Sequence, residues 1–509
     1  SCSVGPEQEY FLVDHDQYLK RDDLIFTGRT LFGAMPPKGQ ELDDHYFGTI
    51  RERQAGYMKD LNIELWKLGI LSKTQHNEVA PAQHEMAPIY NTANIATDHN
   101  QIVMETMKKV ARRHGLECLL HEKPFAGING SGKHDNWSIV TNTGINLLNP
   151  GPAPHDNKQF LLFLSAVIKA VDENAALLRM SASNPGNDHR LGANEAPPAI
   201  ISIFLGEQLE DIVEQIIATG TATHSIKGEK MDIGVSSIPP VKKDATDRNR
   251  TSPFAFTGNK FEFRMVASSM SIAGANTVLN TVVADVLEGM ADELAGAADF
   301  DSAVDALIQK TLKEHQKVIF NGNGYSDEWV AEAERRGLPN LKTTPDALPT
   351  MVKPENVAFF DKYGVLNEAE VHARYVSKAE QYSKLLNIEA NTMVYMARSL
   401  YLPALFDYSG DIATSVATKA ELGIEATAEK ELVKTLTNGI NAIYEATSDL
   451  ESNNADARAI EDPQAQCDAY RDAVIPSMEH LRASVDAMEK ICGADYWPVP
   501  SYNSLLFWV

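Results

Sequence analysis

The sequence predicts a mixed α/β or α+β core followed by a long helical region. In residues 7–264, short β-rich runs alternate with helical ones, which is typical of a domain in which helices cover a sheet. Beyond about residue 271, long windows rich in Ala, Glu, Leu and Lys dominate. At 509 residues the chain is too long for one ordinary core. We therefore divide it into residues 1–275 and residues 276–509.

The elements expected in the first part follow from local residue patterns. Residues 100–114 repeat apolar side chains along one expected helical face, with a stripe formed by Ile102, Val103, Met107 and Val110. A second strong helix is expected over 160–180. β-Branched and aromatic residues favour strands over 9–13, 200–205 and 260–266, and the mostly apolar run 116–120 is also expected to be a strand.

The second part is expected to be almost entirely helical. Ser326 is a typical N-cap of a short helix, which Gly337 and Pro339 end. Acidic, Asn- and Pro-containing breaks such as 451–462 separate longer helices. We find no fixed-period repeat, which favours a packed helical domain over a solenoid. The longer helices are expected over 276–296, 303–320, 367–402, 424–449 and 465–491.

Composition argues against several classes of protein. Seventy acidic against 46 basic side chains give a net charge of −24, which disfavours binding to nucleic acid. The sequence has no run of about 18 apolar residues, so no membrane span is expected. Residues 1–6 have neither the basic nor the apolar region of an export signal. The cysteines form no CxxC pair, which predicts a cytoplasmic protein with reduced thiols and no zinc site: Cys2, Cys118, Cys467 and Cys492.

Residues 128–138, Ile-Asn-Gly-Ser-Gly-Lys-His-Asp-Asn-Trp-Ser, carry the most informative pattern in the chain. Glycine tolerates positive φ and lacks a Cβ, so Gly130 and Gly132 let the backbone come close to a ligand. Asn136 and Ser138 follow His134 at alternate positions of an expected strand. Taken alone, such a segment is more often a glycine turn before a strand. Together with its neighbours it is a candidate substrate and metal platform.

Polar residues two apart recur on three expected strands, and residues i and i+2 of a strand share a face. Each pair therefore points either to solvent or into a polar cavity, and the pattern alone leaves both readings open. Phe261, Phe263 and Met265 flank the third pair, so the opposite face of that strand is expected to cover a core. The pairs are Glu7 and Glu9, His134 and Asn136, and Glu262 and Arg264.

A further acidic element lies in residues 77–88. Glu78 and Glu85 would share a face of a helix, but Pro81 and Pro88 make a continuous helix improbable. A strand-loop-strand course that brings both carboxylates to one site is expected, with an ordinary polar loop as the alternative.

Two arginine-bearing loops complete the set. Residues 188–198 carry Arg190 and Glu195, and residues 247–252 add a short basic cluster around Arg250. The planar fork of arginine suits carboxylate and phosphate. Carboxylates, a histidine and arginines together suit ATP-dependent activation of an acid, because hard oxygen ligands hold Mg²⁺ or Mn²⁺ and arginines stabilise a transferring phosphoryl group. As isolated features they would be solvated surface charges.

At these residues the chain resembles glutamine synthetase, most closely the large type III class. The resemblance implies an α+β catalytic domain with an antiparallel sheet lining the active site. The helical remainder of that domain and a type III helical extension would follow, with an ending similar to Trp-Pro-Val-Pro-Ser-Tyr at 497–502. The ordered motifs that carry it span about half of the chain: 5–9, 77–88, 129–138, 190–197, 249–252 and 260–264.

The resemblance also implies two or more Mg²⁺ or Mn²⁺ ions in each site. One ion would lie beside the glutamate and ammonium sites, held by Glu9, Glu78 and Glu85. Another would bridge the ATP phosphates, held by Glu7, His134 and Glu262.

Substrate contacts are implied in the same way. Asn129 and Gly130 would contact glutamate, and Arg190 would bind its α-carboxylate. Glu195 would close over the site as a flap and take a proton from the ammonium adduct. Two arginines would face the transferred phosphate and the γ-carboxylate: Arg250 and Arg264. The nucleotide contacts would come from Asn136, Ser138 and Tyr90, with Arg250 at the phosphate.

The implied reaction joins ammonia to L-glutamate and gives glutamine, ADP and phosphate through a γ-glutamyl phosphate. Phosphorylation by ATP is needed because a carboxylate oxygen is a poor leaving group. A closed flap would keep water from hydrolysing the acyl phosphate. The resemblance further implies a role in nitrogen assimilation and a homo-oligomer, a double-ring dodecamer.

The chain also departs from the family pattern. Asn136 stands where the bacterial type I pattern has a second histidine, and Ala255 and Phe256 stand about where it has a further phosphate-binding arginine. The loop before Glu195 is one residue shorter. Family enzymes carry an N-terminal β-grasp domain that supplies an aspartate to the neighbouring subunit's site, and the chain is expected to lack this region and to be incomplete by itself.

Two other functions stay open at this point. A relative that joins glutamate to a larger amine would need a pocket wider than ammonium requires. A non-catalytic structural or regulatory relative would be expected to lose metal ligands. All six matched positions keep Glu or His, which argues against the non-catalytic reading.

Overall fold

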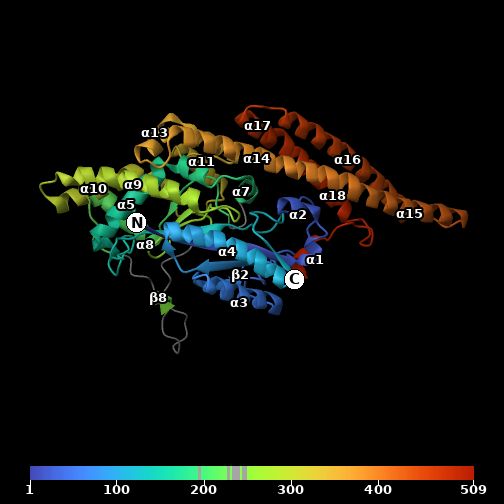
Figure 1. The fold of residues 1–509 in the computed structure, drawn as a ribbon, viewed down its shortest axis with the longest axis horizontal. Coiled ribbons are helices and arrows are strands. Elements are labelled where there is room, and N and C mark those ends of the chain that lie inside the picture. The colour runs from blue at the N-terminus through green and yellow to red at the C-terminus, as the bar shows by residue number, and fades with distance from the viewer. Residues whose placement is uncertain (193–195, 226–229, 232–240, 243–248, 509) are drawn as a thin grey trace.

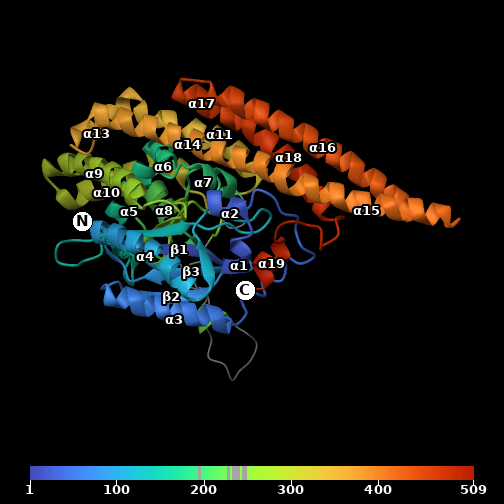
Figure 2. The same cartoon turned by 45° about the vertical axis from the view of Figure 1, so that its right-hand side comes forward.

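A nine-stranded, mostly antiparallel sheet is the centre of the first part of the chain (Figures 1 and 2). The computed structural model describes residues 1–192, 196–225, 230–231, 241–242 and 249–508. The strand order is β2-β3-β1-β6-β11-β10-β7, and β4 and β5 also pair with β1. The strands are β1 (Cys2–Asp14), β2 (Ser72–Asn77), β3 (Gln83–Pro88), β4 (Asn91–Thr92), β5 (Leu116–Leu119), β6 (Lys133–Ile139), β7 (Ile203–Phe204), β10 (Phe254–Phe256) and β11 (Phe261–Phe263). A separate two-stranded pair is formed by β8 (Lys230–Met231) and β9 (Val241–Lys242).

One face of this sheet is apolar and covered by helices. Tyr10 and Leu12 of β1 are fully buried in a cluster with side chains of α3 (Glu52–Lys67) and α4 (Ala93–Arg113). Trp137, Phe261 and Phe263 point to the same face, since they alternate with the polar residues of β6 and β11. These aromatic side chains pack in a second cluster, to which α5 (Lys158–Glu173) and α9 (Ala273–Ala295) contribute. Glu7, Glu9, His134, Asn136 and Glu262 therefore point to the other face, whereas Gln8, Lys133 and Asp135 are buried on the helix-covered face.

The helices of the first part position the loops around the sheet. The helix predicted over 160–180 is two helices in the structure. Asn174 separates them, because its φ of −120° is not helical, and it is the N-cap residue of the second helix. The strand predicted over 200–205 is only β7, since it pairs with β10 over two residues and Gly206, at φ of +79°, turns the chain away. The remaining helices are α1 (His15–Tyr18), α2 (Asp22–Thr27), α6 (Ala175–Ser181), α7 (Pro185–Arg190) and α8 (Glu207–Thr219).

The second part is helical, as the composition predicted. The side chain of Ser326 accepts a hydrogen bond from the Trp329 N–H at 3.1 Å, which confirms the predicted N-cap. The helices are α10 (Phe300–His315), α11 (Asp327–Arg335), α12 (Thr344–Ala347), α13 (Pro354–Lys362), α14 (Glu368–Met396), α15 (Leu402–Glu421), α16 (Thr427–Arg458), α17 (Pro463–Ala469), α18 (Ile475–Glu489) and α19 (Tyr502–Phe507).

Two predicted helix ends in this part are wrong. The helix expected to stop at Leu402 passes through a π-helical turn, Ala397–Tyr401, and continues as α15. The break expected over 451–462 begins only after Arg458, because Asn454 is buried and hydrogen-bonded to Asn387 at 3.1 Å. Tertiary packing therefore keeps a polar, acidic stretch helical against its local propensity.

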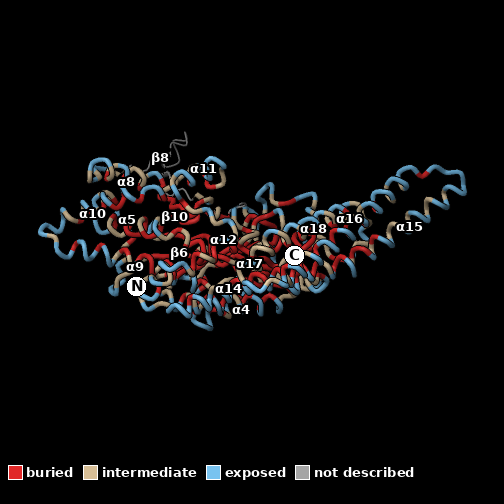
Figure 3. The backbone as a smooth tube through the Cα atoms, turned by 90° about the horizontal axis from the view of Figure 1, so that it is seen from above, coloured by how far each residue is buried: buried red, intermediate tan, exposed pale blue. Residues whose placement is uncertain are grey.

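A layer formed by α14, α16, α17 and α18 lies on one side of the sheet domain, opposite α3 (Figures 1 and 2). This layer has its own hydrophobic cluster, which runs from Ala379 to Val499 and includes Leu31 and Phe32 of the first part. The ends of α15 and α16 project beyond it and are largely exposed (Figure 3). Among the described residues, no helix combines the length and apolar character that crossing a membrane requires.

Candidate active site

The strand register gathers six predicted site residues on the open face of the sheet. Glu7 lies opposite His134, Glu9 opposite Glu85, and Asn136 opposite Glu262. Directly opposed residues of an antiparallel pair have Cβ atoms about 5 Å apart, so their side chains meet. The predicted strand pairs therefore point into one polar site, and the solvent-face alternative is wrong for these residues.

Glu7 and His134 form the centre of this site. Nδ1 of His134 lies 3.2 Å from Oε2 of Glu7, and its Nε2 lies 3.7 Å from Oε1 of Glu9. Burial acts to lower the pKa of His134, but the hydrogen bond to Glu7 and the two carboxylate charges raise it to about 9. Burial likewise acts to raise the pKa of Glu7, and the hydrogen bond and charge of His134 outweigh it, so that this pKa is lowered.

Glu262 is a buried carboxylate held between two cations. Lys260 Nζ lies 3.0 Å from its Oε1, and Arg264 Nη2 lies 3.0 Å from its Oε2. Burial acts to raise its pKa, but the two positive charges bring it down to about 2. Lys260 also donates a hydrogen bond to Asn136 and so ties the two strands together. The sequence had given Lys260 no role, although it shares a strand face with Glu262.

Glu78 and Glu85 are brought together by the predicted strand-loop-strand course. β2 ends at Asn77 and β3 begins at Gln83, and the tight connection places Ala82 at φ of +63°. Ligand atoms of His76, Glu78 and Glu85 all lie within 4.8 Å of one another. The hydrogen bond that His76 donates to Glu85 is the largest influence on the pKa of His76 and raises it to about 9. His76 was missed, although its i and i+2 relation to Glu78, which directly follows β2, could have found it.

The glycine loop is shaped by its protein neighbours. Neither Gly130 nor Gly132 adopts positive φ. A Cβ on Gly132 would lie 2.2 Å from Nη2 of Arg190, and one on Gly130 would lie 2.3 Å from the carbonyl oxygen of Glu122. Both glycines therefore use the missing Cβ that the sequence analysis named, since Arg190 lies against Gly132 and the Glu122 carbonyl lies against Gly130. The tolerance of positive φ is not used.

Arg190 is buried beside this loop, and not all of its N–H groups have a partner among the described residues. It donates to Asn187 Oδ1 and to the Arg264 carbonyl, each at 3.2 Å, and its Nε has no partner in the described part of the chain. Burial lowers its pKa, and the charge of Glu9 opposes that shift. Next to it, Asn129 is paired with Gln40 through two hydrogen bonds, of 2.8 and 2.9 Å. A buried guanidinium with a free N–H is suited to a carboxylate ligand.

Other predicted residues lie further from this centre. Ser138 is on the same strand face and donates to Asn146 Oδ1 at 2.7 Å. The Tyr90 side chain is 69% exposed and lies beside Gly5. The exposed Arg250 guanidinium lies 5.8 Å from the centre of the Tyr46 ring. Glu195 lies outside the described residues.

The donor set of this face fits divalent cations of the hard type. Most of its groups are carboxylate oxygens, which suit Mg²⁺ and Mn²⁺, and two imidazoles lie among them. Burial and the charges of Glu7 and Glu9 raise the pKa of Glu85, although a hydrogen bond from His76 acts against that shift. Three carboxylates thus repel one another across two strands, and a bound cation would relieve this repulsion.

Known proteins are similar to this chain along its whole length. The family described as "Glutamine synthetase, catalytic domain" matches residues 1–200, and the one described as "Glutamine synthetase C-terminal domain" matches residues 303–420. A "Type-3 glutamine synthetase" of Dictyostelium discoideum is 44% identical over 516 residues, which cover 100% of this chain and 70% of that protein. A "Glutamine synthetase" of Butyrivibrio fibrisolvens is 46% identical over 100% of this chain and 73% of its own length.

A third relative, a "Glutamine synthetase" of Bacteroides fragilis strain YCH46, is 42% identical over 99% of this chain and 71% of its own length. The resemblance predicted from the motifs is confirmed, as is the predicted α+β fold with a sheet at the site and a helical region behind it. The chain belongs to the glutamine synthetase family, in its type 3 branch.

Proposed function

We propose that this protein joins ammonia to L-glutamate with ATP and forms glutamine, ADP and phosphate. The proposal rests on two neighbouring features. The first is a sheet face lined by carboxylates and imidazoles, and the second is the buried Arg190 beside the glycine loop. The first can hold cations and phosphate, and the second can hold a carboxylate. Family membership along the whole chain supports the same activity.

Glutamate is bound at the glycine loop. Arg190 receives its α-carboxylate, because the Nε group is buried and unpaired in the described residues. Asn129 and Gly130 contact the remainder of the amino acid. This binding leaves the γ-carboxylate pointing along the sheet face toward Glu7 and Glu262.

Two sets of residues hold the divalent ions. Glu9, Glu78 and Glu85 form one set, and His76 adds a further ligand atom at its edge. Glu7, His134 and Glu262 form the other. Bound Mg²⁺ or Mn²⁺ supplies charge neutralisation for the ATP phosphates.

The chain's own groups position the phosphoryl transfer. The γ-carboxylate oxygen of glutamate attacks the γ-phosphorus, and the bond to the β-phosphate oxygen breaks. Arg250 faces the phosphate. Arg264 donates from Nε and Nη2 to Glu262, so its main action is to orient that carboxylate. Its Nη1 donates to the carbonyls of Asn249 and Ser252, which leaves the second N–H of Nη2 for the γ-carboxylate. Asn136, Ser138 and Tyr90 contact the nucleotide.

Amide formation follows at the same carbon. Ammonia attacks the acyl carbon of γ-glutamyl phosphate, phosphate leaves, and Glu195 accepts the surplus proton. Closure of the segment that carries Glu195 excludes water, which would otherwise hydrolyse the acyl phosphate.

The assembly and location follow from the family alone. We place the protein in a homo-oligomer, a double-ring dodecamer, in which a neighbouring subunit completes each site. The four free cysteines are consistent with a cytoplasmic protein.

The test is the formation of glutamine from glutamate, ammonium and ATP. The full-length gene product is assayed with and without Mg²⁺. A parallel assay replaces ammonium with a longer primary amine. Mg²⁺-dependent glutamine, with little product from the amine, is expected. No glutamine in the presence of all substrates would overturn the proposal, and a preference for the amine would replace it.

A further inference from the structure

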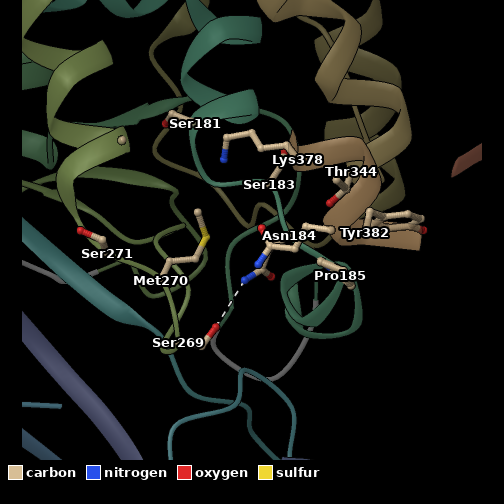
Figure 4. A pocket seen from close by; sticks show the side chains of 12 residues that line it. Ser181, Ser183, Asn184, Pro185, Ser269, Met270, Ser271, Thr344, Lys378 and Tyr382 are labelled. Carbon is tan, nitrogen blue, oxygen red and sulfur yellow. Dashed lines mark hydrogen bonds between the residues drawn. The ribbon is translucent and has the colours of Figure 1, made fainter. Parts of the chain in front are cut away.

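A second cavity lies away from the sheet face, where the catalytic domain meets the helical layer (Figure 4). Its volume is about 360 Å³, which is enough for a small metabolite. The catalytic domain contributes the segments after α6 and before α9, and the helical layer contributes α14. The lining residues used below are Asn184, Ser269, Ser271, Gly274 and Lys378.

Lys378 is the one charged side chain among the residues that line this cavity. It extends from α14 across the cavity toward Ser181 (Figure 4). The described part of the chain gives its ammonium group neither an ion pair nor a hydrogen bond, and burial alone lowers its pKa. A partly buried lysine without a carboxylate is exceptional in a chain with a net charge of −24.

Two further donors face the same space. Gly274 is the second residue of α9, a helix of 23 residues, and the N–H groups of a first helical turn have no acceptor within the helix. Ser271 Oγ accepts from the Ala273 N–H at 3.2 Å, so its own proton is free to bind a ligand. An ammonium group, a helix amino end and a hydroxyl together select an anion.

Two carboxylates lie behind the cavity wall, and both are satisfied from within the protein. Asp188 accepts the N–H and the hydroxyl of Thr344, each at 2.8 Å, and lies 3.6 Å from Arg179. Glu122 accepts the Ser269 N–H at 2.9 Å and the Asn184 amide at 3.3 Å. Neither carboxylate lines the cavity, so neither neutralises Lys378 there.

We propose that this cavity is an effector site for a small anion with a phosphoryl or carboxylate group, bound by Lys378, Ser271 and the amino end of α9. The ligand would bridge the catalytic domain and the helical layer. Its occupancy is linked to the glycine loop through Glu122, whose side chain is held by the cavity wall and whose carbonyl accepts the Ser131 N–H at 2.8 Å. The link to glutamate binding rests on the function proposed above, whereas the anion site does not.

Protection of Lys378 from chemical labelling tests the binding site directly. The whole protein is treated with an amine-reactive acylating reagent, with inorganic phosphate in one arm and succinate in the other, and labelled peptides are quantified by mass spectrometry. At about ten times the dissociation constant, about one site in eleven stays free, so labelling of Lys378 falls about tenfold. Lys384 of the same helix, whose side chain is 72% exposed and paired with Glu380, is the internal control and keeps its labelling.

The two arms separate the ligand classes. Protection by phosphate alone assigns a phosphoryl ligand, and protection by succinate alone assigns a carboxylate. Unchanged labelling of Lys378 in both arms overturns the proposal, because anions held at the sheet face alone would not protect it.

Variants test the link to the active site. Lys378→Met is expected to fold with an unchanged or higher melting temperature, since Lys378 has no partner to lose, and Lys378→Arg keeps the charge. In wild type and in Lys378→Arg, the anion changes KM for glutamate about fivefold or more. Its effect on KM for ATP is the same in the proteins with and without Lys378. Lys378→Met loses this response and the control Lys384→Met keeps it. Equal responses in all four proteins would overturn the effector role, even if labelling places an anion in the cavity.

Discussion

Glu7 of β1 and His134 of β6 lie directly opposite each other on neighbouring antiparallel strands, with 3.2 Å between Oε2 and Nδ1. The ion pair keeps the imidazole protonated at neutral pH, since its pKa is raised to about 9. A histidine must be neutral to act as a metal ligand. In the metal site proposed above, a cation that binds His134 would therefore have to displace this proton, and two predictions follow from this relationship.

Divalent-ion affinity should rise with pH. Between about pH 6.5 and pH 8.5, each ion bound at His134 releases one proton, so the affinity for Mn²⁺ increases about tenfold per pH unit. Titration calorimetry in buffers of different ionisation enthalpy counts the released protons. His134→Asn should release about one proton fewer, and an equal count in both proteins would contradict the assignment.

The stability of the metal-free chain should change in the opposite direction. The folded pKa of His134, about 9, exceeds the ordinary value of 6.5, so its contribution is fully present below about pH 6.5 and is lost as the pH rises through about 9. With EDTA present, the melting temperature of wild type should fall more between pH 6.5 and pH 9.5 than that of His134→Asn. Parallel losses would show that the Glu7 pair does not contribute.

Glu262 should be essential for turnover, but alanine is the wrong probe. Removal of one partner of a buried ion pair costs about 3–5 kcal/mol, and Glu262→Ala would leave the buried Arg264 and the partly exposed Lys260 without it. Glu262→Gln keeps the shape and should lower Mg²⁺-dependent turnover about 100-fold at unchanged secondary structure. Circular dichroism and glutamine assays check both points. The control Glu293→Gln, at a pair whose carboxylate is 51% exposed, should behave as wild type.

A methyl group on Gly132 should weaken glutamate binding. The new Cβ would lie 2.2 Å from Nη2 of Arg190 and push the guanidinium aside. Gly132→Ala is therefore expected to raise KM for glutamate about tenfold or more, with a smaller effect on KM for ATP. Gly289 of α9 has no neighbour within 4 Å of such a Cβ, so Gly289→Ala should leave KM unchanged and raise stability by up to about 1 kcal/mol. Equal KM values in the two variants would refute the role of the loop.

Glu195 should act after phosphoryl transfer. Glu195→Ala is expected to slow amide formation more than acyl-phosphate formation, because the proton of the ammonium adduct loses its acceptor. Rapid-quench measurement of phosphate and glutamine separates the two steps. An unchanged rate of glutamine release would contradict the flap role.

The sequence by itself determined the types of element and the chemistry of the site. Alternation at Glu7 and Glu9, at His134 and Asn136, and at Glu262 and Arg264 predicted polar strand faces, and Pro81 predicted a loop between Glu78 and Glu85. These features depend on residues close in sequence, where periodicity and backbone restriction are local properties. The ordered motifs also sufficed to predict the family.

Only the tertiary structure decided which faces meet. β1 lies between β3 and β6, which sets Glu9 against Glu85 and Glu7 against His134, and no local pattern encodes a register between strands so far apart in sequence. The same holds for His76, for Lys260 and for the close approach of Arg190 to Gly132. At Asn454 the tertiary structure overrides the local pattern. The sequence predicted a break there, but the residue is buried in the helical layer and α16 continues through it. Local sequence determines the secondary structure and the side chains of each segment. The packing of distant segments decides which of these side chains meet, because contact energies act through space and not along the chain.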